Sequence, residues 1–262
     1  MPGIQRSGPT MSLLQHRWLR RDMEKYRDLT CGAAPGTHAE VVQLLQRQVP
    51  PPHAGVIDLG AGSGALLRRL QDAGFVDLHG ADLSQPRWTL TGVPYTRTDL
   101  DGPFSRAFQR KFRVACLSET LEHLESPRQA LMEVRELLEA DGYLIITLPN
   151  VAFWEGRLKF ALTGELWGFG ENNYREIRHI SPLTRDQLRL MLQEIGFRVI
   201  AATTTGSYAT PLRRILFAPL WLPLAAVAGR EVLGECIVVL AQKAPADPGL
   251  SHPSAPWVWM KE

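Results

Sequence analysis

Cysteine, charge of one sign and a secretory signal are scarce or missing in this sequence of 262 residues. The three cysteines, Cys31, Cys116 and Cys236, are odd in number and far apart, which argues against a disulfide framework and favours a reducing compartment. We therefore expect a cytoplasmic protein. The formal net charge is only +2, so a nucleic-acid partner is not expected. The first residues have no apolar core before a small-residue cleavage site, which argues against a signal peptide.

A long uninterrupted apolar run is also lacking, although a helix that crosses a membrane needs about 20 such residues. Residues 215–229 (ILFAPLWLPLAAVAG) come nearest, but Pro219 and Pro223 interrupt them. The main interpretation is an apolar helix pair over 212–230 that is buried or covers the domain. A second is an interfacial segment that gives peripheral membrane contact where a lipid-linked substrate lies. A transmembrane span is the least favoured.

Strand patterns alternate with helix patterns through most of the chain, which predicts an α/β fold with parallel strands and helical crossovers. Thr37 and Thr184 are predicted helix N-caps. The expected strands are Val56–Leu59, Val76–Ala81, Tyr95–Thr98, Phe112–Leu117, Tyr143–Leu148, Phe197–Thr203 and Cys236–Ala241. The expected helices are Ser12–Leu29, His38–Val49, Ala65–Ala73, Arg185–Ile195 and one that starts at Pro127 and stops at Gly142.

A stretch of aromatic residues among glycines, followed by the polar ENNYREIRH, breaks this rhythm after the fifth strand, and we expect a lid insertion over 151–181. Its aromatic residues favour a lid core over a sugar-stacking platform. We expect a single domain over 11–243 that begins with a helical cap over 11–50. A leader (1–10) and a Pro-rich tail (244–262) are expected to be disordered.

Three glycines on alternate positions, Gly60, Gly62 and Gly64, follow the first strand in VIDLGAGSGALL. Such a loop places backbone N–H groups and a helix N-terminus against an anion. A dinucleotide fingerprint needs G-x-G-x-x-G, and a triphosphate loop ends in Lys-Ser or Lys-Thr, where this chain has Ala65-Leu66. The spacing therefore suits a smaller anion, such as an amino-acid carboxylate.

Acidic residues at successive strand ends complete the predicted ligand site. Asp58 is placed to take an amino group, and Asp82 in GADLS to accept from two ribose hydroxyls. Asp99 in RTDLDG is placed to accept from an adenine amino group, with Leu83 and Leu100 as apolar walls. Amino acid, ribose and adenine in this order describe S-adenosyl-L-methionine. The structural alternatives are tight packing for the glycines, a helix cap for Asp82 and a turn for Asp99.

The motifs DLGAGSG, ADLS, TDLDG, LSETLEHLESP and GYLIITLPN resemble, in that order, those of class I S-adenosylmethionine-dependent methyltransferases. The resemblance covers about Val56 to Gly196. It implies a Rossmann-like, seven-stranded, mostly parallel sheet with an antiparallel last strand and helices on both faces. It also implies a cofactor site made of Asp58, Gly60, Ala61, Gly62, Gly64, Asp82, Leu83, Asp99, Leu100 and Ser118.

Two stretches resemble narrower groups. LSETLEHLESP is similar to the ubiquinone-biosynthesis O-methyltransferases. The segment from LPN through REIRHISPLTRDQLRLMLQEIGF resembles bacterial methyltransferases found with glycan and lipid-linked sugar pathways.

Catalytic candidates follow the fourth strand, where Glu119, Glu122 and His123 would share one face of a helix. His123 has the pKa range of a general base for a substrate hydroxyl. The three residues together could instead bind a divalent metal, as in some relatives of the ubiquinone enzyme, or hold loop and core together. His179 is a second candidate base, or else a hydrogen-bonded cap over the sheet. We expect no resident metal.

The sequence thus predicts an enzyme that methylates a small or lipid-linked acceptor at a hydroxyl oxygen. The alternative is a cofactor-binding regulatory protein of the same fold without methyl-transfer activity. The glycine spacing disfavours a nicotinamide oxidoreductase. A nucleic-acid methyltransferase is disfavoured by the near-neutral charge and because LSET stands where a Pro-Pro-Tyr-type motif would follow the fourth strand.

Overall fold

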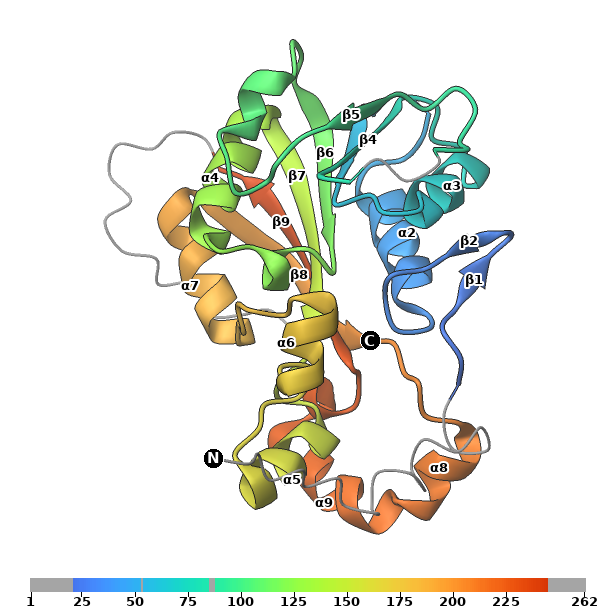
Figure 1. Cartoon of the computed structure of the whole chain (residues 1–262), viewed down its shortest axis with the longest axis vertical. Helices are drawn as coiled ribbons and strands as arrows, with labels where there is room; N and C mark the ends of the chain where they lie inside the picture. Colours follow the sequence, from blue (N-terminus) through green and yellow to red (C-terminus); the bar gives the residue numbers. More distant parts are fainter. Residues whose placement is uncertain (1–20, 53, 85–87, 245–262) are drawn as a thin grey trace, which may run out of the picture.

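A computed structural model describes residues 21–52, 54–84 and 88–244. Its centre is a seven-stranded sheet with the order β5-β4-β3-β6-β7-β9-β8 (Figure 1). Only β9, among these strands, runs antiparallel to its neighbours β7 and β8, and the remaining pairs are parallel. This confirms the predicted sheet. The strands are β3 (Val56–Leu59), β4 (Leu78–Asp82), β5 (Tyr95–Arg97), β6 (Phe112–Ser118), β7 (Leu138–Pro149), β8 (Phe197–Thr205) and β9 (Cys236–Lys243).

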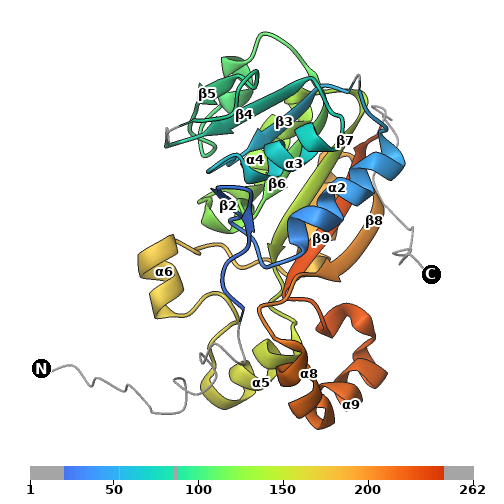
Figure 2. The ribbon, with the colours of Figure 1, turned by 90° about the vertical axis from the view of Figure 1, so that its right-hand side faces the viewer.

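Helices cover both faces of the sheet, as predicted (Figures 1 and 2). Alternate side chains of each strand point to opposite faces, so the sheet has two apolar layers. Ile57 and Leu59 lie in one buried cluster with residues of α4 and α7, whereas Val56 lies in the other with residues of α2 and α3. The four helices are α2 (Thr37–Gln48), α3 (Ala65–Asp72), α4 (Pro127–Leu137) and α7 (Arg185–Ile195).

Helix ends follow the predicted signals at some positions but not at others. Thr184 and Gln187 form a capping box at the start of α7. Thr37 is not an N-cap, because Gly36 takes that position with a left-handed φ of 96°. Helix α4 ends at Leu137 rather than at Gly142, because the next residue, Leu138, already pairs with a residue of β6.

The predicted helix Ser12–Leu29 is wrong for its described part. Lys25–Tyr26 (β1) and Leu29–Thr30 (β2) form a small antiparallel hairpin instead. The Tyr26 hydroxyl donates a hydrogen bond to Asp72 of α3 at 2.9 Å, so the hairpin is anchored on the domain. Tertiary contact here overrides a helical residue pattern. The remainder of that helix, the predicted leader and all of the predicted tail except Ala244 lie outside the described residues.

Four further helices lie beyond the carboxyl ends of the parallel strands (Figures 1 and 2). Two of them form the predicted insertion. The other two form the predicted apolar helix pair, which we call the arm (residues 211–228). The helices are α5 (Trp154–Thr163), α6 (Glu171–Ile177), α8 (Pro211–Leu216) and α9 (Ala218–Ala228). Within the described residues, none of the helices has the length and apolar character needed to cross a membrane.

The arm covers the domain but is not itself buried. Phe153, Trp154 and Val232 form a small buried cluster, and apolar residues of α9 such as Trp221 pack against it. No residue of α9 is fully buried. The helix pair therefore packs on this small cluster while α9 stays largely exposed, which differs from the buried form of the expectation.

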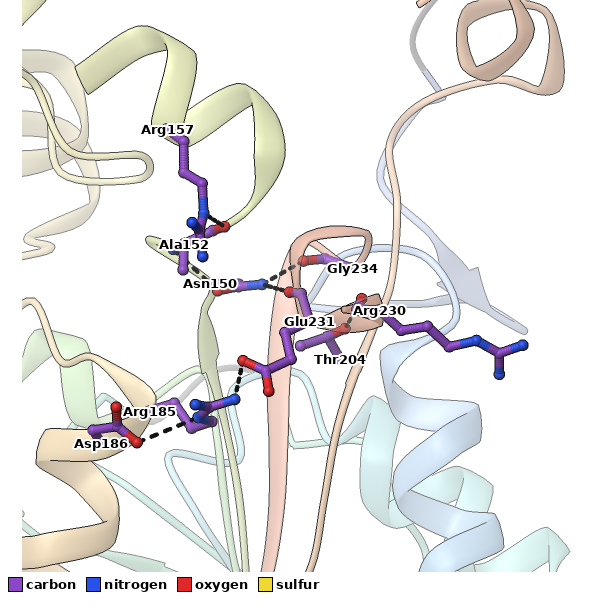
Figure 3. A network of polar contacts seen from close by, with 9 residues as sticks. All are labelled: Asn150, Ala152, Arg157, Arg185, Asp186, Thr204, Arg230, Glu231 and Gly234. Carbon is purple, nitrogen blue, oxygen red and sulfur yellow. Dashed lines mark hydrogen bonds and ion pairs between the residues drawn. The ribbon is translucent and has the colours of Figure 1, made fainter. Parts of the chain in front are cut away.

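A polar network ties the end of the arm to the sheet (Figure 3). The Asn150 side-chain amide donates hydrogen bonds to the carbonyl oxygens of Glu231 at 2.7 Å and Gly234 at 2.9 Å. The Glu231 carboxylate in turn forms an ion pair with Arg185, the first residue of α7. Asn150 is only 2% exposed, so these contacts are shielded from water and fix the base of the arm.

Candidate active site

The glycine loop lies between β3 and α3 and has a left-handed backbone at all three glycines. Their φ angles are 84° at Gly60, 51° at Gly62 and 82° at Gly64. A Cβ atom on Gly60 would lie 2.4 Å from the Thr120 hydroxyl, and one on Gly64 would lie 2.7 Å from a methyl of Leu90. A Cβ on Gly62 would meet no atom within 4 Å. Packing thus explains the outer two glycines, while the middle one leaves open space for a ligand.

Asp82 ends β4 and holds this loop in place. Its Oδ2 accepts a hydrogen bond from the Gly62 backbone N–H at 2.9 Å. Its Oδ1 accepts from the backbone N–H and the hydroxyl of Ser84, both at 3.0 Å. Because a carboxylate oxygen accepts about two hydrogen bonds, Oδ2 has room for one more donor.

Asp58 is the least satisfied acid of the loop. It is 2% exposed, and its Oδ1 has no hydrogen-bond partner among the described residues. Burial, followed by the nearby charge of Asp82, raises the pKa of Asp58 to about 7. A buried carboxyl without partners is costly, and a ligand ammonium group beside it would supply the missing donor and charge. The loop therefore fits a ligand with both a carboxylate and an amino group.

The remaining predicted cofactor residues of this region differ in accessibility. Asp99 is exposed, and its Oδ1 accepts from the Asp101 backbone N–H at 3.0 Å, which is the turn that was the structural alternative. Leu83 is 58% exposed, whereas Leu100 is 6% exposed and packs in the main core. Ala61 is also buried, at 7%. Of the two predicted walls, Leu83 is the one open to an adenine ring.

Glu119 follows β6 and has a strained backbone, with a φ of 50° at a residue that is not glycine. Its backbone N–H donates to the Thr147 hydroxyl oxygen at 3.0 Å, and that hydroxyl donates to Glu119 Oε1 at 2.8 Å. Ser118 Oγ lies 3.1 Å from the same hydroxyl. Burial raises the pKa of Glu119 to about 7, partly offset by hydrogen bonds from Thr147 and Cys236. A left-handed backbone at a residue other than glycine is found most often at functional sites.

Thr147 was not among the site residues predicted from the sequence. It is 1% exposed on β7 and contacts two of the predicted site residues, Ser118 and Glu119. The available signal was a single hydroxyl within the otherwise apolar stretch LIITLP.

The predicted shared helix face of Glu119, Glu122 and His123 is wrong. The structure has only a short 3-10 helix, η2 (Leu121–His123), which Glu119 precedes. The ligating atoms of Glu122, His123 and His179 instead lie within 4.8 Å of one another. The backbone sets this arrangement, because the Glu122 carbonyl accepts from the N–H groups of Ile180 at 2.9 Å and Ser181 at 3.0 Å.

Glu122 is 1% exposed, and neither of its carboxylate oxygens has a hydrogen-bond partner within the described ranges. Its Oε1 lies 4.0 Å from Nε2 of His179. The rings of His123 and His179 meet edge to face with centroids 4.7 Å apart. Nδ1 of His179 lies 2.8 Å from the Gly168 carbonyl oxygen, so this nitrogen carries the proton and Nε2 has a free lone pair.

Burial keeps all three groups neutral. It raises the pKa of Glu122 well above its usual range, with the charge of Glu119 as the next cause. Burial lowers the pKa of His123 and of His179. A neutral imidazole with a free Nε2 is able to take a proton from a substrate. The same carboxylate and two imidazoles are also able to hold a divalent transition metal.

Solved structures that share this fold include S-adenosylmethionine-dependent methyltransferases. One from Archaeoglobus fulgidus has a TM-score of 0.55 at 17% identity, with 79% of this chain and 94% of that chain covered. A putative methyltransferase from Haloferax volcanii, in complex with the Trm112 methyltransferase activator, has a TM-score of 0.56 at 15% identity over 80% and 91%. Magnesium protoporphyrin IX methyltransferase from Synechocystis, with bound SAH, has 0.52 at 17% over 79% and 82%. These likenesses establish the fold.

Residues 33–202 match a protein-family model described as a methyltransferase domain. The match covers more than half of the chain, and the chain belongs to this methyltransferase family. No curated protein sequence matches the chain significantly.

Proposed function

We propose that this protein transfers a methyl group from S-adenosyl-L-methionine to a hydroxyl oxygen of a small or lipid-linked acceptor. One observation carries the proposal: the glycine loop, with open space at Gly62, is held by the strand-end carboxylate of Asp82 and follows the strand of the buried Asp58, whose Oδ1 has no hydrogen-bond partner among the described residues. The family membership and the fold support it. The narrower kinship with ubiquinone-biosynthesis and glycan-pathway enzymes stays a prediction from the motifs.

The cofactor roles follow from the accessible groups. Asp58 binds the amino group of the cofactor, and the loop from Gly60 to Gly64 binds its carboxylate at the start of α3. Oδ2 of Asp82 accepts from a ribose hydroxyl with its remaining lone pair. Leu83 contacts the adenine ring. Asp99 accepts from the adenine amino group with the carboxylate oxygen that is not bonded to the Asp101 N–H. Leu100 supports this wall from the core.

S-adenosylmethionine supplies a methyl group that is already activated as a sulfonium. The protein therefore has to align the acceptor oxygen about 3 Å from the methyl carbon, exclude water and remove the hydroxyl proton. We assign proton removal to the His123–His179 pair, with Nε2 of His179 as the free acceptor atom. The Gly168 carbonyl, which accepts from Nδ1 of His179, orients this ring and stabilises the imidazolium that results. Glu119, held by Thr147, orients the acceptor hydroxyl.

The insertion and the arm define the acceptor side of the site. Residues 151–181 bring His179 onto Glu122 and His123, so we propose that this insertion covers the acceptor. The arm beside it exposes apolar side chains, which suits an acceptor with a lipid chain and peripheral membrane contact through 215–229.

Calorimetric titration with S-adenosylhomocysteine, with NAD as the control, tests the cofactor assignment. Micromolar binding of the first and none of the second is the expected result. Transfer of a labelled methyl group to phenols, sugars and lipid-linked sugars then tests the chemistry. Cofactor binding without transfer to any acceptor would favour the regulatory alternative, and absence of binding would overturn the proposal.

A further inference from the structure

Two adjoining cavities lie between the carboxyl end of β8 and the arm. Their volumes are about 270 Å³ and about 280 Å³. Both are lined by Ser207, Ala209, Arg214 and Leu233, so they form one groove, which we call the arm groove. Because β8 runs parallel to the strands of the cofactor loop, the groove opens at the same edge of the sheet as the candidate active site.

Two arginine side chains of this groove have no acidic partner. Arg214 lines both cavities and Arg21 lines the second. In the described part of the chain, neither guanidinium forms a hydrogen bond or an ion pair. The neighbouring Arg213 differs, because it is buried and paired with Glu155. Glu235, which follows the groove residue Gly234, already accepts from backbone and hydroxyl donors. The groove thus presents two unneutralised cations to a ligand.

The arm that carries Arg214 also exposes large apolar side chains. The segment 211–229 contains no Asp or Glu. The exposed members are Leu212 (55%), Ile215 (73%), Leu216 (61%), Leu220 (46%), Leu222 (53%) and Val227 (91%). An apolar surface of this kind marks an interaction site. Combined with unpaired arginines, it suits the interface of an anionic membrane.

The position of the arm agrees with this use. It forms one end of the molecule, away from β4 and β5 (Figures 1 and 2). The side chain of Arg230, which follows the arm, points away from the network that fixes the arm's base (Figure 3). A second copy of this chain docked on the same surface would bring the arginines of both copies together, which like-charge repulsion disfavours.

We propose that the arm groove binds the phosphate group of a membrane lipid, with Arg21 and Arg214 as its partners and the exposed side chains of α8 and α9 inserted into the membrane surface. This deepens the proposed function, on which it rests for the link to a lipid-linked acceptor. Guanidinium groups match phosphate oxygens in a bidentate geometry. The lipid phosphate would then lie at the edge of the sheet where methyl transfer occurs.

Flotation of the full chain with vesicles tests the proposal. The vesicles contain phosphatidylcholine alone, or with phosphatidic acid or phosphatidylglycerol at equal surface charge. We expect the strongest binding with phosphatidic acid, whose phosphate is the most accessible. Arg214→Gln should weaken that binding about fivefold, the effect of one arginine at an anionic surface. Arg47→Gln removes the same charge from an exposed site on α2 and is the matched control.

An equal loss of vesicle binding in Arg214→Gln and Arg47→Gln would overturn the assignment of the arm groove as the phosphate site. Equal binding to the two kinds of anionic vesicle would overturn it as well. The double variant Ile215→Ser, Leu216→Ser should lose binding to every vesicle, and retention would overturn the insertion. Soluble glycerol phosphate that binds as tightly as the phosphatidic acid vesicles would overturn the proposal that the phosphate belongs to a membrane lipid. Titration of each variant with S-adenosylhomocysteine separates the two proposals, since vesicle binding without cofactor binding would remove the methyl-transfer function alone.

Discussion

The Oδ2 atom of Asp82 accepts a hydrogen bond from the backbone N–H of Gly62 at 2.9 Å. This bond joins the end of β4 to the glycine loop after β3, although 20 residues separate them along the chain. One carboxylate therefore both shapes the loop and faces the space that the loop encloses. The structural role and the proposed cofactor role of Asp82 are not alternatives.

Replacement of Asp82 should impair both roles. Asp82→Ala should weaken binding of S-adenosylhomocysteine about tenfold or more, equivalent to about 1.4 kcal/mol. Asp77→Ala is the matched control, because Asp77 precedes the same strand and pairs with Arg110 in a partly exposed ion pair. Calorimetry on both variants checks the prediction. Cofactor binding that survives in Asp82→Ala would remove the ribose assignment.

Substitutions at Gly60 and Gly62 should affect fold stability and cofactor binding differently. Gly60→Ala should destabilise the fold by about 1–2 kcal/mol from its left-handed backbone and about 1–3 kcal/mol from overpacking against Thr120. Gly62→Ala meets no neighbour, so it should unfold closer to the wild type yet bind the cofactor more weakly. Thermal unfolding and calorimetric titration measure the two effects. Equal destabilisation of both variants would contradict this division.

The sheet and the glycine loop could be predicted because their signals are local. Val56, Ile57 and Leu59 form a short apolar run, which is typical of a parallel strand that is buried on both faces. The left-handed glycines likewise belong to one short motif. The arrangement of these elements in a mostly parallel sheet followed from their alternation with helices.

The rest depended on contacts between distant parts of the chain. Tyr26 lies in a hairpin because it reaches Asp72, which no local pattern indicates. His179 could be proposed as a base from its surroundings, but its place beside Glu122 and His123 depends on backbone hydrogen bonds across the insertion. The sequence therefore indicated which residue types take part in the candidate site but not which of them meet.

Cofactor affinity should rise with pH through about 7. The folded-state pKa of Asp58, raised to about 7 by burial, means that the free protein holds this carboxyl protonated below that pH. A cofactor ammonium group requires the ionised form, so binding below pH 7 includes the cost of deprotonation. The same raised pKa predicts that the stability of the free protein falls as pH increases from the unfolded value, near 4, to about 7.

Asp58→Asn should remove most of this pH dependence and weaken binding above pH 7. Glu119, whose pKa is also raised to about 7, titrates in the same range, so Glu119→Gln is the control. Titrations on either side of pH 7 with both variants check the assignment. A pH dependence of cofactor affinity that persists in Asp58→Asn and disappears in Glu119→Gln would show that Glu119, and not Asp58, is the titrating group.

The histidine pair should affect turnover rather than cofactor binding. His123→Ala and His179→Ala should each reduce methyl transfer about 100-fold or more, the usual contribution of a general base. Their affinity for S-adenosylhomocysteine should stay near the wild-type value. Tyr174→Ala removes a ring that is 61% exposed in the same insertion and is the control. Loss of folding in both histidine variants would instead support a structural role.

Removal of metal distinguishes the two chemical uses of Glu122, His123 and His179. With the pair acting as a base, dialysis against a chelator should leave turnover unchanged, in agreement with the expectation that no metal is resident. Glu122→Gln should then keep the fold, because the buried carboxyl is neutral and an amide has the same shape. Measurement of bound metal by elemental analysis, before and after dialysis, accompanies the assay. Turnover that disappears with the chelator and returns with added divalent cation, in the wild type but not in Glu122→Gln, would show that the cluster holds a metal and would displace the base mechanism.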